Sequence, residues 1–211
     1  MKSQTQKQAG IAVILGSLLM ILTMALHPVG GNFEHLVKVA TMAIIAHSIA
    51  IFSIPITLLG FWGLSQRLAD QPLLSRAGLI FGSISLMAAL MAAAINGLAL
   101  PFFVRRFENA SPEELEMVRV ALNYGMSLNH AMDYIFIGGI CMAILIWSIA
   151  IWKTRTLPLV IALLGGVIGI GFLVTLASGF VLVDVHGFRI FVFGVAFWIL
   201  STGILMLKPK P

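Results

Sequence analysis

The sequence ATMAIIAHSIAIFSIPITLLGFWG, residues 40–63, contains no charged side chain and thereby indicates the fold class. An uncharged apolar run of this length is typical of a helix that crosses a membrane, since about 20 residues at 1.5 Å each cover the hydrocarbon core. The same run contains one ionisable side chain, His47, between apolar neighbours. It therefore predicts a transmembrane helix that carries an unusual imidazole.

Similar apolar runs recur along the 211-residue chain, in which 60% of the residues are hydrophobic and 10% are charged. These fractions lie far from those of soluble globular proteins. We expect a single all-α domain over residues 1–211, a polytopic membrane protein with six transmembrane helices in one bundle. The expected spans are approximately 10–27, 37–63, 78–103, 130–152, 157–183 and 188–207.

The distribution of basic residues favours one orientation in the membrane. If the N-terminus is cytoplasmic, most of the 13 Lys and Arg residues fall on the cytoplasmic side, as the positive-inside rule requires. This cytoplasmic set comprises Lys2, Lys7, Arg67, Arg76, Lys153, Arg155, Lys208 and Lys210. We expect a multi-pass protein of the inner (plasma) membrane with both termini in the cytoplasm. The positive net charge then reflects contact with the lipid bilayer and makes no case for nucleic acid.

The longest connection between the expected spans, residues 104–129, lies on the outer side. Ser111 and Glu114 form a capping box, which marks the start of a helix. The residues that follow place their apolar side chains on one stripe. We expect an amphipathic helix over 111–124 that lies on the outer membrane surface and breaks near Gly125. It would serve as a connector or as a lid over an outward site.

Each even-numbered span carries a histidine towards its outer end and a tryptophan towards its inner end. The pairs are His47 with Trp62, His130 with Trp147, and His186 with Trp198. This pattern indicates three pseudo-repeated helical hairpins. The alternative is chance, because apolar helices of low complexity resemble one another easily.

All five histidines fall in the expected outer half of the protein: His27, His35, His47, His130 and His186. Asn96 is expected in the same half, and Asp133 lies three residues after His130, on the same helical face. We expect His47 about ten residues, roughly 15 Å, below the outer end of its helix. Because ionisable groups at membrane depth are costly, these side chains are candidates for a functional site.

Two kinds of cofactor suit this outward-facing His/Asp/Asn site. His47, His130 and His186 would bind a transition metal, zinc or copper, while Asp133 orients one imidazole ring. Alternatively, His47 and His130 would ligate haem b from facing helices, with Asn96 as a partner in the site. Binding of a transition metal or haem is the leading hypothesis, although the sequence contains no metal-binding or nucleophile motif of regular spacing.

The simplest alternative is that the polar side chains only pack. His47 would then form an interhelical hydrogen bond near Ser48, to Asn96 or to a backbone carbonyl. Asp133 would pair with His130, Arg105 or Arg106. In that case the chain is a non-enzymatic membrane subunit or a protein that binds lipid or a partner, as a homo-oligomer or with a membrane partner subunit.

A third alternative needs no cofactor but still uses the site. The same residues would line an outward vestibule for a proton or a small polar ligand. His130 and Asp133 would then transfer protons in a proton-coupled transporter or an intramembrane enzyme. The sequence leaves these classes, enzyme and non-enzyme, open.

Overall fold

The computed structural model describes residues 3–209, and over this range the chain is all-helical. The long helices are α1 (Ser3–Leu26), α2 (Phe33–Arg67), α3 (Pro72–Ala94), α5 (Pro112–Thr154), α6 (Leu159–Ala177) and α7 (Val185–Met206). A π-helix, η1 (Ile95–Ala99), joins α3 to the short helix α4 (Leu100–Arg106). Lys2 and Lys210, used in the orientation argument, lie outside the described residues.

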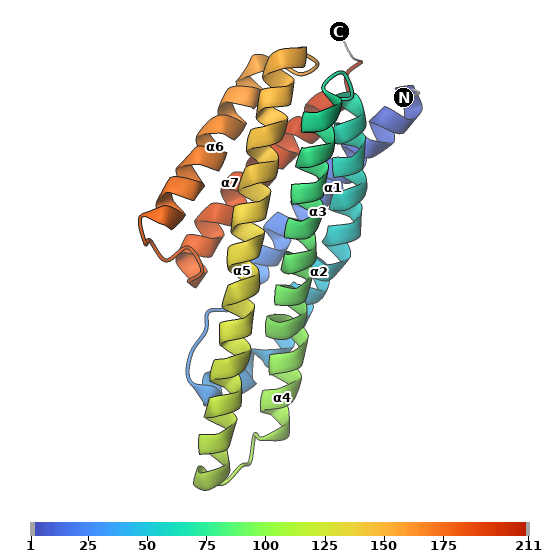
Figure 1. Ribbon diagram of the computed structural model, residues 1–211. Coiled ribbons are helices and arrows are strands. Elements are labelled where there is room, and N and C mark those ends of the chain that lie inside the picture. Colours follow the sequence, from blue (N-terminus) through green and yellow to red (C-terminus); the bar gives the residue numbers. More distant parts are fainter. Residues whose placement is uncertain (1–2, 210–211) are drawn as a thin grey trace.

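The long helices form one bundle. The start of α1 and the end of α7 lie at the same end of it (Figure 1). Within residues 3–209, six helices are long and apolar enough to cross a membrane, where α3, η1 and α4 count as one. The expected all-α polytopic fold is therefore confirmed. Helix α5 packs against α3 and α6, and α1 packs against α2 and α7. The three pseudo-repeated hairpins stay a prediction.

The core of the bundle is built around two stacked tryptophans. Trp147 of α5 and Trp198 of α7 are fully buried, with ring centroids 6.4 Å apart and planes 8° from parallel. The indole N–H of Trp147 donates to the carbonyl of Ser75 at 3.3 Å, and that of Trp198 donates to the carbonyl of Ile161 at 3.0 Å. Since lipid offers no hydrogen-bond partner, these bonds satisfy both indoles and join α5 to α3 and α7 to α6.

The helices differ in length, so that α2, α4 and α5 continue beyond the level at which α1, α6 and α7 end (Figure 1). His27, directly after α1, contacts His47 of α2 with ring centroids 4.8 Å apart. Phe188, near the start of α7, lies against Phe136 of α5 with centroids 6.1 Å apart. These contacts place His47 and Phe136 at the level where the short helices end.

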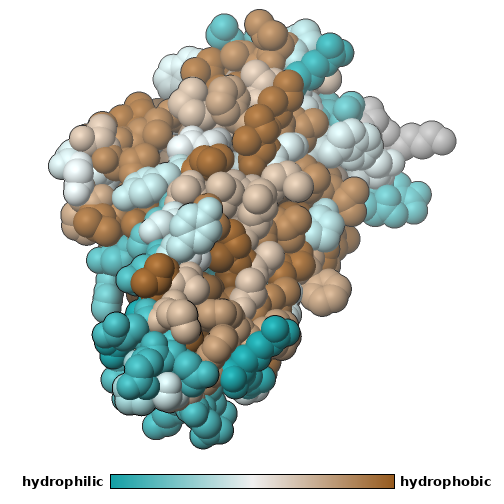
Figure 2. All heavy atoms as spheres, turned by 60° about the horizontal axis from the view of Figure 1, so that its bottom comes forward, coloured by the Kyte–Doolittle hydropathy of each residue, from teal (hydrophilic) through white to brown (hydrophobic). Residues whose placement is uncertain are grey.

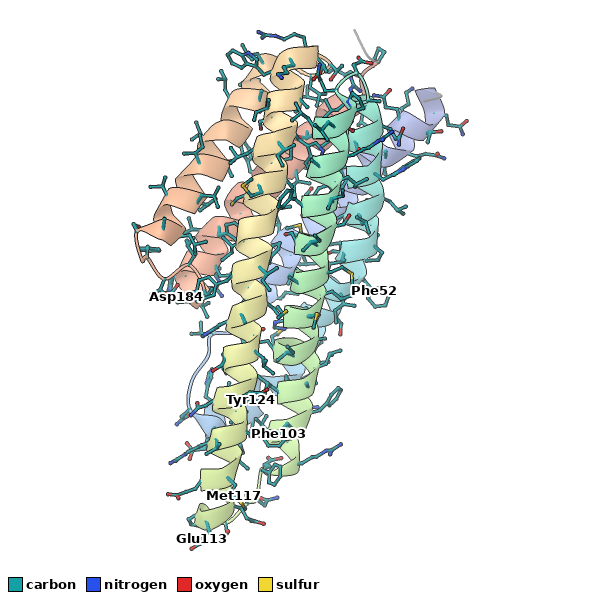
Figure 3. All side chains as sticks on the ribbon, viewed as in Figure 1. Phe52, Phe103, Glu113, Met117, Tyr124 and Asp184 are labelled. Carbon is teal, nitrogen blue, oxygen red and sulfur yellow. The ribbon has the colours of Figure 1, made fainter. Side chains whose placement is uncertain are left out.

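We call residues 33–46, 97–106 and 112–135 the extension, because they lie beyond this level. Figure 3 shows Asp184, at the start of α7, well short of the end of α5 that carries Glu113 and Met117. Helix α6 has 19 residues, which is roughly 28 Å and close to the thickness of the hydrocarbon core. Helices α2 and α5, with 35 and 43 residues, are longer than a hydrocarbon core is thick.

The extension has its own small core and a charged far end. Val104 of α4 packs with Val118 and Leu122 of α5, and all three are buried. Hydrophilic side chains gather at the far end (Figure 2). The exposed charged residues there include Glu34, Lys38, Arg105, Arg106, Glu113 and Glu116. The extension also exposes large apolar side chains, among them Phe102, Met117 and Val120.

The structure differs from the sequence-based expectation at residues 111–124. The capping box of Ser111 and Glu114 is confirmed, but the expected break near Gly125 is wrong, because α5 runs unbroken from Pro112 to Thr154. Gly125 instead allows a close approach, since a Cβ atom there would lie 2.7 Å from Cδ2 of Leu100. The segment is thus the first part of α5, packed against α4.

Arg67, the last residue of α2, ties the opposite end of the bundle together. Its guanidinium is buried and donates to the carbonyls of Thr156, at 3.1 and 3.2 Å, and of Met206, at 3.2 Å. It also donates to the carbonyls of Lys208 and Pro209. Carbonyls at the C-terminal end of a helix lack partners within the helix and attract cations, so Arg67 fastens α7 to α2.

Replacing Arg67 should destabilise the bundle. We expect Arg67→Met to lower the free energy of unfolding by roughly 2–3 kcal/mol, because buried carbonyls lose charged hydrogen-bond donors. The matched control is Arg76→Met, since Arg76 is exposed. Thermal unfolding in detergent micelles measures both variants, and equal midpoints for them would contradict the structural role of Arg67.

Candidate functional site

A cavity of about 240 Å³ lies where the extension joins the rest of the bundle. Its walls come from α1, residues 27–30, α2, the consecutive helices α3, η1 and α4, and from α5 and α7. Apolar side chains line it towards the bundle (Met20, Met24, Ile54, Leu86 and Val192) and towards the extension (Leu36, Leu100, Val104 and Leu122). Between these two apolar parts the lining is polar.

We call the side chains at this level the polar belt: His27, His47, Asn96, Asn129, His130 and Asp133. Four of them, His47, Asn96, His130 and Asp133, are candidates from the sequence, and the structure brings them to one cavity. His186 is not brought there, because it is exposed on α7 and does not line the cavity. His27 and Asn129 are belt residues that the sequence analysis did not include in the site.

His47 is buried and both of its ring nitrogens face a partner. Nδ1 lies 2.8 Å from the carbonyl oxygen of Ala43 and therefore donates, since a carbonyl can only accept. Nε2 is then the acceptor, and it faces Nδ2 of Asn96 at 3.5 Å. The contact with Asn96 is one of those that the packing alternative predicted for His47, whereas the bond to Ala43 lies within α2.

The structure defines the position of His47 along the bundle, and its depth in a membrane stays a prediction. Counted from Phe33, the start of α2, His47 is fourteen residues along the helix rather than about ten. It lies level with His27, at the end of α1. The polar belt is therefore at the boundary between the bundle and the extension.

Gly97 makes room for His47. A Cβ atom on Gly97 would lie 1.9 Å from Cβ of His47, a separation that atoms cannot adopt. Four residues later Pro101 has no N–H to donate to the carbonyl of Gly97, and the π-helical turn at 95–99 is the local adjustment to this loss. The same turn carries Asn96, which lies against Nε2 of His47.

Asn129 and Asp133 form the other side of the belt, one turn apart on α5. Nδ2 of Asn129 donates to Oδ2 of Asp133 at 2.7 Å, and both residues are 6% exposed. Asp133 thus pairs with Asn129. The packing alternative had instead predicted a pair with His130, Arg105 or Arg106. Oδ1 of Asn129 is buried and has no hydrogen-bond partner within the described residues. Such an orphaned acceptor is costly and calls for an explanation.

His27 closes the belt from the segment after α1. Its Nδ1 donates to the carbonyl of Pro28 at 2.8 Å, and the backbone carbonyl of His27 accepts from the guanidinium of Arg189 at 2.8 Å. Burial lowers the pKa of His27 below its ordinary value, the nearby charge of Arg189 lowers it further, and the bond to Pro28 opposes both. His27 is therefore held in its neutral form.

The geometry gives no support to a metal or haem site. Across residues 3–209, no group of three or more His, Cys, Asp or Glu side chains is placed to hold a metal ion. Haem ligation requires a free ring nitrogen, and those of His47 face Ala43 and Asn96. Zinc, copper and haem b therefore stay predictions from the sequence alone.

Asn129 is a member that sequence reasoning missed but could have found. It lies four residues before Asp133, so the two share one face of a helix. His27 had no such signal, because its place in the belt depends on how α1 packs against α2.

Comparisons of the chain with protein families, curated proteins and solved structures gave no significant match.

Gly97→Ala should destabilise the protein at the belt. We expect the free energy of unfolding to fall by roughly 2 kcal/mol, because the added methyl group overpacks the contact with His47. Gly166→Ala is the matched control, since a Cβ atom there meets nothing within 4 Å and alanine favours a helix. Unfolding curves in micelles compare the two variants, and equal stability would show that the close contact is not essential.

The neutral state of His27 predicts a dependence of stability on pH. With its folded pKa below 6.5, the unfolded chain binds more protons as the pH falls through 6.5, so the free energy of unfolding falls as well. Above about pH 7.5 this contribution is constant. His47 and Arg189 face His27, and the comparison with His27→Gln isolates its share.

The measurement is the unfolding midpoint of the wild type and of His27→Gln between about pH 5 and pH 8. The wild type should lose stability more steeply towards acid than the variant. Parallel curves would mean that His27 titrates equally in the folded and unfolded states.

Proposed function

We propose that this chain is an integral membrane protein that binds a bilayer-soluble amphipathic molecule in the cavity at the polar belt. The observation that carries the proposal is the cavity lining, which is apolar on both sides of a single polar level. Ligand sites are mostly apolar with a few convergent polar groups. An apolar chain fits the walls, and a polar group fits the belt.

The apolar part of the cavity suits an extended chain. On α2 the lining continues from His47 to Thr57, which is roughly 15 Å along the helix. The hydroxyls on this side do not require a ligand, because those of Thr23, Ser53 and Thr57 donate to carbonyls of their own helices. A hydrocarbon chain therefore meets no unsatisfied group there.

The orientation deduced from Lys and Arg completes the proposal. With both termini in the cytoplasm, the extension stands on the outer face of the inner membrane, and the polar belt lies at its outer boundary. An amphipathic molecule in a bilayer places its polar group at the membrane boundary, level with the polar belt, and its chain inside the bilayer. A partner subunit or a second copy of the chain stays a prediction.

This proposal takes up the lipid-binding alternative from the sequence in place of the cofactor hypothesis. A transition metal or haem needs ring nitrogens that point at the ion, whereas His47 is held by Ala43 and Asn96. An amphipathic ligand needs only the space and the polar atoms of the belt.

Filling the cavity should remove the ligand. We expect the purified wild type to retain an amphipathic molecule through mild detergent extraction, and Ala89→Phe to lose most of it, since Ala89 lines the cavity and a phenyl ring occupies the space. Native mass spectrometry measures the retained mass. Ala99→Phe, at an exposed position outside the lining, is the matched control.

Two results would contradict the proposal. One is a wild type with no bound molecule after extraction from native membranes. The other is equal retention in Ala89→Phe and Ala99→Phe when both variants are folded.

A further inference from the structure

We infer that the head group bound at the polar belt is an amine, and that Asn129 and Asp133 accept hydrogen bonds from it. This inference rests on the proposed function, because it names the chemistry of the molecule that the cavity would bind. It follows from which atoms of the belt are already satisfied and which are left over.

The donating nitrogens of His27 and His47 are used within the protein. Nδ1 of His27 donates to Pro28, and Nδ1 of His47 donates to Ala43. Nδ2 of Asn96 faces Nε2 of His47. A head group that only accepts hydrogen bonds, such as a ketone or an ester, therefore finds few donors to bind it.

The atoms left over on His27 and Asn129 are acceptors. Oδ1 of Asn129 is buried without a partner, and its orientation follows from the amide nitrogen, which donates to Asp133. A carboxylate accepts several hydrogen bonds, and Asp133 receives one at Oδ2 from Asn129. Nε2 of His27 is a further acceptor, because Nδ1 carries the hydrogen. A ligand that donates hydrogen bonds therefore fits the polar belt.

The charge in the lining selects an amine among such donors. Of the described residues that line the cavity, Asp133 is the one carboxylate, and none is Lys or Arg. Phosphate and carboxylate head groups need cationic side chains and would be repelled by Asp133. A primary ammonium group supplies the missing positive charge and three N–H donors at once.

The two recognising side chains are well placed for a single head group. Asn129 and Asp133 are joined by a hydrogen bond of 2.7 Å on one face of α5, and both are 94% buried, since each is 6% exposed. A rigid, buried pair selects a ligand better than exposed side chains do, because its rotamers are already fixed. The apolar walls below then hold the chain of the amine.

Three probes with the same chain test the inference: dodecylamine, dodecanol and dodecanoate. Binding to the wild type in lipid nanodiscs is measured by titration calorimetry, and Ala89→Phe in the same nanodiscs gives the partition of each probe into the lipid alone. We expect dodecylamine to bind at least about tenfold more tightly than the other two, as the loss of a charged hydrogen bond predicts.

Variants of the belt locate the recognition. Asp133→Asn should abolish the preference for dodecylamine over dodecanol, because it removes the charge and keeps the shape. Asn129→Leu should weaken dodecylamine binding by about tenfold, whereas Asn123→Leu, at an exposed position on the same helix, should leave it unchanged. Thermal unfolding confirms that each variant is folded.

The outcomes separate the inference from the proposed function. If dodecanol or dodecanoate binds as tightly as dodecylamine in the cavity, the amine is wrong while the proposed function stands. The amine is equally wrong if Asp133→Asn keeps the full preference. If no probe binds the wild type better than Ala89→Phe, the proposed function fails together with the inference.

Discussion

The unequal length of the helices sets the position of the cavity and of the polar belt. Helices α1 and α7 stop at the level of His47 and Phe136, whereas α2, α4 and α5 continue. Where a packed bundle loses some of its helices, the remaining ones have unmatched inner faces. The extension fills part of this space with its own core around Val104, and the cavity is what remains between the two cores.

The contact between His47 and Gly97 fixes the geometry at this junction. Because a glycine backbone meets the imidazole directly, α2 and the η1 turn approach more closely than side chains would allow. The π-helical turn before Pro101 then brings Asn96 to the free nitrogen of His47. The π-helical turn thus allows a buried polar group to find a hydrogen-bond partner. Irregular helices near a bilayer are usually tolerated where the polar groups are satisfied in this way.

The two sides of the polar belt differ in how completely they are satisfied. On the α1–α2 side, His27 and His47 have partners for the nitrogens that donate, and these contacts are internal to the fold. On the α5 side, Asn129 keeps an acceptor unused beside the carboxylate of Asp133. A buried oxygen without a hydrogen-bond partner lowers the stability of the fold. A ligand that donates to this oxygen would form the missing hydrogen bond on the α5 side.

The fold class, the capping box at Ser111 and four of the site candidates could be predicted from the sequence, because apolar runs, caps and isolated polar residues are local features. These candidates are His47, Asn96, His130 and Asp133. Helix packing brings His27 and Asn129 into the site, keeps His186 out of it, and sets the level of His47 in the bundle. These facts depend on where neighbouring helices end and how closely their backbones approach. Such distances arise from packing between segments far apart in the sequence, and no local pattern encodes them.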